Sequence, residues 1–93
     1  MREKLIEQNL VLAVRRMGGI APKFVSPGWA GAPDRLVLLP GGHLAFVEVK
    51  APGKSLRQLQ VRRKGQQEAL GFRVYVIVRP EQIGGVLGEF RSP

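Results

Sequence analysis

Residues 33–50 read PDRLVLLPGGHLAFVEVK, two apolar runs joined by Pro-Gly-Gly. A proline and two glycines between β-prone runs are typical of a hairpin, which predicts antiparallel strands over residues 34–39 and 43–50. In such a pair, the start of the first strand lies close to the end of the second. Acidic residues stand at both of these strand ends, where a buried charge is costly unless a partner compensates it.

The charged residues at these ends are Asp34, Glu48 and Lys50. Glu48 and Lys50 are two positions apart on a strand, so their side chains point to the same face. Counting outward from the turn, Asp34 faces roughly Glu48, with Cβ atoms about 5 Å apart. Two carboxylates at this spacing can share one cation, and without one they repel and one tends to stay protonated. The carbonyl of Val49 would complete an oxygen-rich set; an ordinary cross-strand ion pair to Lys50 is the alternative.

Periodicity and turn residues divide the rest of the chain into helices and strands. Pro22 places the strand around it at a sheet edge. Ser55 and Gln58 have capping-box spacing, which predicts a helix start at Ser55. The predicted elements, in order, are a helix over 2–17, strands over 20–26, 34–39 and 43–50, a helix from Ser55 to about Leu70, a strand over 72–78 and a helix beginning at Pro80.

Composition narrows the class of protein and the kind of metal site. The 93 residues carry 15 Lys and Arg against 7 Asp and Glu, a net charge of +8 that favours a polyanionic partner. The absence of cysteine excludes disulfides and thiolate metal sites, and a single histidine excludes a multi-histidine zinc site within one chain. A metal here must have oxygen ligands, which suits Mg²⁺ or Mn²⁺. Because there is no signal-peptide core and no apolar run of ~20 residues, we expect a cytoplasmic protein without a membrane partner.

Four segments spread over the chain carry a recognisable combination of residues: GAPDR at 31–35, FVEVKAPG at 46–53, LQ at 59–60 and LGFRVYV at 70–76. Together they resemble the VRR-NUC domain, the virus-type replication-repair nuclease branch of the PD-(D/E)xK superfamily. The resemblance covers nearly the whole chain. It implies an α/β fold, a single compact domain over residues 1–93 with an αβββαβ core and a mixed sheet flanked by helices.

The resemblance also implies an activity and roles for individual residues. It suggests a metal-dependent endonuclease with Asp34 and Glu48 as metal ligands, Lys50 as the catalytic lysine and Gln60 as a supporting active-site residue. Small members of this kind look like phage or bacterial homodimers that act on branched DNA, Holliday junctions in particular.

The first helix is expected to add another carboxylate. At about 100° per residue, Glu7 projects between Val11 and Val14, at the edge of the apolar face, where an acid needs a partner. The resemblance also places an active-site glutamate in this helix. We choose Glu7, with Glu3 one turn earlier as the alternative. An acid near the helix start also interacts favourably with the helix dipole, and this simpler explanation fits Glu3 better than Glu7.

Basic residues gather on the central helix and beside the acids, where they can neutralise phosphates. The helix residues spread over more than one face, so only some can contact a single duplex, and a solvated basic surface is the alternative. Trp29 stands in a Gly- and Pro-rich loop, where it could stack on a base or cover the core. His43 lies away from the acids. The predicted DNA contacts are Lys23, Arg35, Lys54, Arg57, Arg62, Arg63 and Lys64.

These observations predict an Mg²⁺- or Mn²⁺-dependent endodeoxyribonuclease without a small-molecule cofactor. A four-way junction presents two symmetric strands, and one small domain carries one site, so a homodimer is expected. Two alternatives stay open. One is a non-catalytic nucleic-acid-binding module on the same scaffold, and the other is a restriction-type, sequence-specific nuclease.

Overall fold

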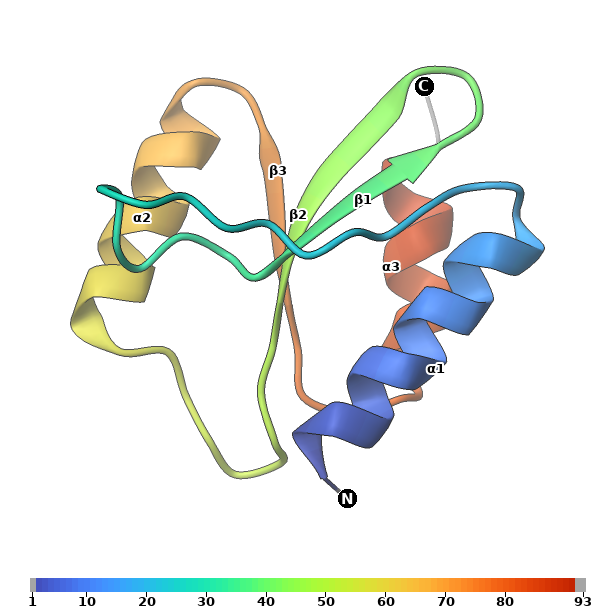
Figure 1. Cartoon of the computed structure of the whole chain (residues 1–93), viewed down its shortest axis with the longest axis horizontal. Helices are drawn as coiled ribbons and strands as arrows, with labels where there is room; N and C mark the ends of the chain where they lie inside the picture. Colours follow the sequence, from blue (N-terminus) through green and yellow to red (C-terminus); the bar gives the residue numbers. More distant parts are fainter. Residues whose placement is uncertain (1, 92–93) are drawn as a thin grey trace.

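The hairpin forms the centre of the structure. The computed structural model describes residues 2–91, and in that range three strands form one mixed sheet in the order β1-β2-β3 (Figure 1). β1 (Arg35–Leu39) pairs antiparallel with β2 (His43–Val49), and β2 pairs parallel with β3 (Arg73–Ile77). Leu39 pairs with His43, so the predicted hairpin and its register are confirmed.

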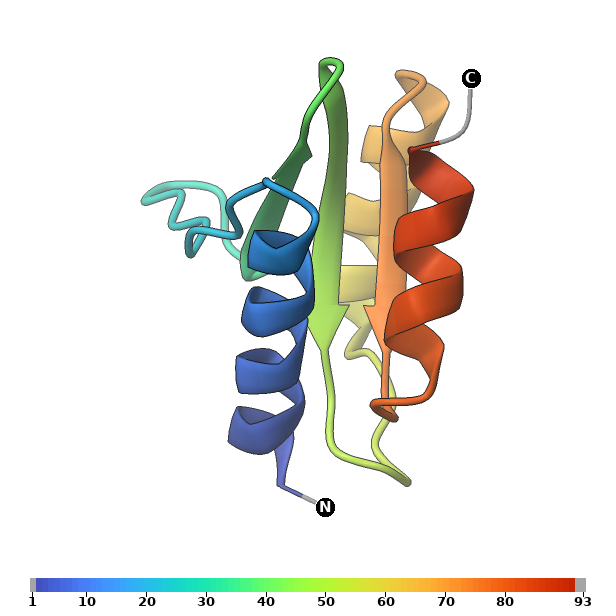
Figure 2. The same ribbon diagram turned by 90° about the vertical axis from the view of Figure 1, so that its right-hand side faces the viewer.

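Three helices flank the sheet within the described range, one on one face and two on the other (Figure 2). α1 (Glu3–Arg16) and α3 (Gln82–Phe90) cover one face, and α2 (Gln58–Ala69) covers the other. The parallel pairing of β2 and β3 requires a crossover connection, which α2 provides. The α/β fold with a mixed sheet flanked by helices is therefore as the sequence predicted. Among the described helices, none is long and apolar enough to cross a membrane.

The core lies between the sheet and the α1–α3 layer. Alternate residues of β2, Ala45, Val47 and Val49, are fully buried on this face. Ile6 and Leu10 of α1 are fully buried against them, as helical spacing of the apolar residues predicted. Burying an aliphatic side chain stabilises the fold by about 1.5–3 kcal/mol, so this layer holds the α1 helix against the sheet.

Residues 20–26 do not form the regular edge strand that the sequence predicted. Residues 20–24 run antiparallel to β1 and make backbone hydrogen bonds to residues 34–38, but only two isolated bridges result. Two bonds of a full ladder are missing. Pro22 has no N–H to donate, and the backbone N–H of Asp34 donates to the Glu48 carboxylate instead. The segment is therefore a partial edge, interrupted where the two acids meet.

The predicted N-cap of the second helix at Ser55 is wrong. The N-cap of α2 is Arg57, whose backbone N–H donates to Oε1 of Gln60 at 2.9 Å. The other end of the same amide, Nε2, donates to Oε2 of Glu48. Gln60 thus both caps α2 and contacts the sheet, and this tertiary contact fixes where the helix begins.

One glycine position tests the packing of α1 against the sheet edge. A Cβ at Gly19 would overlap the backbone carbonyl oxygen of Leu38 and lie 2.9 Å from Cδ2 of Leu39. We expect Gly19→Ala to lower the free energy of unfolding by about 1–3 kcal/mol, measured by urea denaturation. The matched control is Gly85→Ala in α3, where nothing lies within 4 Å, and it should stabilise the protein by about 0.5–1 kcal/mol. Equal effects of both changes would contradict this packing.

Candidate active site

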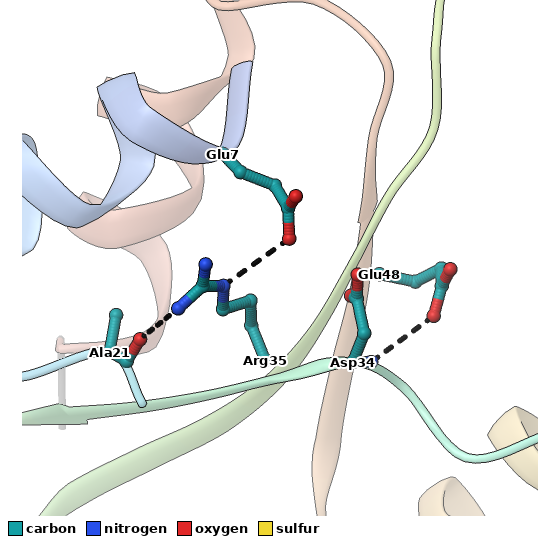
Figure 3. Close-up of polar contacts among 5 residues, drawn as sticks. All are labelled: Glu7, Ala21, Asp34, Arg35 and Glu48. Carbon is teal, nitrogen blue, oxygen red and sulfur yellow. Dashed lines mark hydrogen bonds and ion pairs between the residues drawn. The ribbon is translucent and has the colours of Figure 1, made fainter. Parts of the chain in front are cut away.

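Asp34 and Glu48 lie side by side at adjacent ends of β1 and β2 (Figure 3). The backbone N–H of Asp34 donates to Oε1 of Glu48 at 3.2 Å. This bond continues the register of the hairpin by one residue beyond the last β1–β2 pair, Arg35 with Val47. The structure therefore brings together the two acids that the sequence paired.

Glu48 is only 6% exposed, and three other groups contact its carboxylate. Its Oε1 accepts the hydrogen bond from Asp34, and its Oε2 accepts one from Nε2 of Gln60 at 3.2 Å. Nζ of Lys50 lies 3.5 Å from the same Oε2, as expected for residues on one face of a strand. Burial raises the pKa of Glu48, and the charge of Lys50 opposes that rise. The partners hold this carboxylate in one orientation.

One oxygen of the Asp34 carboxylate lacks such a partner. Its Oδ1 is buried and makes no hydrogen bond to any other described residue. Burial, followed by the charges of Glu48 and Glu7, raises the pKa of Asp34 to about 7, and the backbone N–H of Val49 acts in the opposite direction. A buried oxygen without a partner, next to other carboxylates, is a site that a cation would stabilise.

Glu7 reaches the same site from α1 through an arginine of β1. Nε of Arg35 lies 3.3 Å from Oε1 of Glu7, and Nη1 of Arg35 donates to the carbonyl of Ala21 at 2.8 Å (Figure 3). Both charged side chains are about 15% exposed. Glu3 is exposed on the same helix, and its charge acts on the pKa of Glu48. Arg35 was predicted to contact phosphate; here it contacts Glu7 and Ala21.

Few oxygen atoms that could bind a cation lie around Asp34. Across residues 2–91, no three His, Cys, Asp or Glu side chains are arranged as a metal site. The backbone of Val49 adds to the two carboxylates. Because Lys50 donates its N–H to Ile77 of β3, the backbone groups of Val49 point to the opposite side of β2, toward Asp34. The structure thus places the backbone of Val49 beside the carboxylates of Asp34 and Glu48.

Arg63 has a contact that the sequence did not reveal. Its Nε donates to the carbonyl of Ala30 at 2.8 Å, and its guanidinium lies 4.9 Å from the centroid of the Trp29 ring. These contacts tie the loop before Asp34 to α2, and they cover one face of Trp29. Loop and helix are more than 30 positions apart along the chain, so no local pattern could indicate the pairing.

The other predicted DNA contacts occupy different positions. Lys64 pairs with Glu68 at 2.9 Å within α2. Lys54, Arg57 and Arg62 are exposed. Lys23 is exposed on the partial edge, where its residue bridges to Arg35.

Comparisons with known proteins agree on one kind of activity. No family model matches the sequence. The chain is 53% identical over 77 residues to "Putative nuclease p44" of Acyrthosiphon pisum secondary endosymbiont phage 1, and the match covers 83% of each chain. A solved structure described as a VRR_NUC domain superposes with a TM-score of 0.88 at 28% identity, over 95% of this chain and 96% of that one.

The raised pKa of Asp34 predicts how the stability of the metal-free protein depends on pH. The pKa rises from 3.8 to about 7, so between these values the folded state holds a proton that the unfolded state has released. Stability should therefore fall as the pH rises from about 4 to about 7. Asp34→Asn should remove most of this fall and should stabilise the protein at pH 8, measured by urea denaturation in EDTA.

Glu81→Gln is the matched control, because Glu81 is an exposed acid far along the chain at the start of α3. The slope of stability against pH should stay as in the wild type in this variant. An unchanged slope in Asp34→Asn would show that Asp34 is not the titrating group.

Proposed function

Because this chain belongs to the VRR-NUC family of nucleases, we propose that it is a metal-dependent, structure-specific endonuclease that cleaves DNA phosphodiesters at Holliday junctions or other branches. The observation that carries the proposal is the pair of carboxylates at the strand ends. Asp34 presents a buried oxygen without a partner, beside a Glu48 that three other groups hold in place. Its place of action would be the cytoplasm of a bacterial or phage-infected cell, consistent with its phage relative.

The residues at the site fit a divalent cation. Asp34, Glu48 and the carbonyl of Val49 would hold Mg²⁺ or Mn²⁺, since hard cations prefer oxygen donors. The cation would give the unpartnered Oδ1 of Asp34 a partner and offset the repulsion that raises its pKa. When bound, it would supply Lewis-acid activation of a phosphodiester and neutralise charge that develops there.

The side chains around the acids have separate tasks in this proposal. Lys50, at the rim of the pair, would orient the attacking water or stabilise the negative charge on the phosphate in the transition state. Gln60 holds Glu48 in one orientation through Nε2, while its Oε1 is fixed by the N-cap of α2. Arg35 holds Glu7 beside Asp34. The lysine acts on substrate, and the other two are positioning residues.

Two single changes test the assignment of the acids and the lysine. Asp34→Asn and Lys50→Ala should each lower the rate of cleavage by at least ~100-fold, because the first removes a charged ligand of the proposed cation and the second removes the cation that would face the reacting phosphate. Binding of a four-way junction should stay largely intact. The measurement is gel cleavage of linear, flap and four-way substrates with Mg²⁺, with Mn²⁺ and with EDTA.

His43→Ala serves as the control for this experiment, because His43 lies at the hairpin turn, at the opposite end of β2 from Glu48. It should cut at the wild-type rate. Wild-type rates in both test variants would refute the site. Binding without cleavage by the wild-type protein would favour a non-catalytic module, and sequence-dependent cleavage of linear DNA would favour a restriction-type enzyme.

The homodimer belongs to the same proposal, and an exposed apolar surface supports it. Phe24, Phe46 and Phe72 form edge-to-face contacts with centroids 5.5 and 6.0 Å apart. Phe72 is 48% exposed and Leu70, beside it, is 77% exposed. We call Phe24, Leu44, Phe46, Leu70 and Phe72 the aromatic patch. Contiguous apolar surface of this kind marks protein interfaces, and a two-fold dimer uses one patch on both subunits.

Changes in the aromatic patch should therefore separate the subunits. We expect the wild type to have the mass of a dimer in light scattering, and Leu70→Glu to have that of a monomer, because the change would bury one uncompensated carboxylate from each subunit in the interface. Val61→Glu is the control, an apolar residue of α2 that is 55% exposed outside the patch. A wild-type protein that is monomeric both free and on DNA would overturn the dimer.

A further inference from the structure

A groove runs along α1 on the side that faces residues 20–24. It has a volume of about 620 Å³, and its walls come from α1, the partial edge and the start of β1. In Figure 1, residues 20–24 come after α1 and cross in front of the sheet. Lys4, Gln8 and Arg15 line the α1 wall, and Lys23 lines the opposite wall. None of these four except Lys23 was predicted to take part in function.

Three basic side chains of the groove have no charged or hydrogen-bonding partner among the described residues. Within residues 2–91, the side chains of Lys4, Arg15 and Lys23 make no ion pair or hydrogen bond. Arg35 also lines the groove, but its charge is matched by Glu7. Three cations without a partner around one groove complement a chain of phosphates.

Two apolar side chains also line the groove. Leu12 is 47% exposed there, and Val11 lies next to it. Lys4 and Arg15 are eleven positions apart on one helix, which separates them by about 16 Å along its axis. Cations and exposed apolar side chains in one groove match a nucleic-acid strand whose bases are not paired, because only such a strand can turn a base face onto a side chain.

The groove also continues the candidate active site. Glu7 lines it, and the charge of the same Glu7 acts on Asp34. Arg35, which also lines the groove, directly follows Asp34 in the chain. A strand that leaves the two acids on this side therefore enters the groove without crossing α2.

We propose that the groove between α1 and residues 20–24 binds the unpaired DNA strand that extends from the cleaved phosphate. The phosphates contact Lys4, Arg15 and Lys23, and a base or sugar packs on Leu12. This inference rests on the proposed nuclease function, and it would explain why the enzyme prefers branched DNA to a plain duplex. Duplex DNA hides its bases and gains only the charge contacts, whereas a strand freed at a branch gains both.

Matched pairs of variants on α1 test the groove. Arg15→Ala removes a groove cation, and Arg16→Ala removes an exposed cation outside the groove, so both variants have the same net charge. Leu12→Ser and Leu5→Ser form the second pair, with exposed fractions of 47% and 45% in the wild type. Binding of a fluorescent 20-nucleotide poly-dT strand and of a 20-base-pair duplex is measured by anisotropy in EDTA over a range of salt. Thermal melting checks that each variant is folded.

We expect Arg15→Ala to weaken binding of the single strand by roughly five- to tenfold, and to lower the slope of log affinity against log salt by about 0.7. Leu12→Ser should weaken binding of the strand but not of the duplex. Arg16→Ala and Leu5→Ser should bind the strand like the wild type. Equal losses of strand affinity in Arg15→Ala and Arg16→Ala would refute strand binding in the groove. Equal losses of affinity for strand and duplex in Leu12→Ser would refute it as well.

The outcome for the groove can be separated from the outcome for the nuclease. Cleavage of branched DNA by the wild type, together with identical strand binding by Arg15→Ala and Arg16→Ala, would refute strand binding in the groove and support the nuclease function. Selective loss of strand binding in Arg15→Ala and Leu12→Ser, together with no cleavage by the wild type in Mg²⁺ or Mn²⁺, would support strand binding in the groove and refute the nuclease function.

Discussion

The Glu48 carboxylate is the interaction on which the site depends, because it joins three parts of the chain that are distant in sequence. One oxygen accepts the backbone N–H of Asp34, at the entry to β1, and the other accepts Gln60, in the first turn of α2. A carboxylate that is 6% exposed would be strongly destabilising without such partners. The same bonds therefore compensate its burial and set the positions of β1 and α2 around it.

The parts of the fold governed by local rules could be predicted from the sequence. The two apolar runs and the Pro-Gly-Gly turn predicted the hairpin and its register, and from that register followed the contact of Asp34 with Glu48. The apolar stripe of α1 predicted its buried face. Each of these features depends on residues a few positions apart, or on a strand pairing that a short turn fixes.

The two wrong predictions concern the start of α2 and the edge strand. α2 begins at Arg57, where Gln60 joins the helix N-cap to Glu48, and the edge at residues 20–24 is interrupted at Pro22 and where Asp34 donates to Glu48. One-dimensional patterns do not contain the bonds to Glu48. Arg35 and Arg63 stay predicted phosphate contacts, and the structure adds protein partners that their charge and position did not indicate: Glu7 for Arg35, and Ala30 and Trp29 for Arg63. A net charge of +8 indicates a polyanionic partner but does not say which cations remain available to it.

The pairing of Arg35 with Glu7 also helps to explain how three carboxylates can lie near one another without a bound cation. Lys50 and Arg35 balance two of the three negative charges of Glu7, Asp34 and Glu48, which leaves about one uncompensated. In the absence of metal, a proton on Asp34 removes that charge near neutral pH. A divalent cation can replace this proton, and the site would then carry a net positive charge suited to a phosphate. The arginine therefore keeps the cluster stable without a metal, and the unpartnered oxygen of Asp34 keeps it able to accept one.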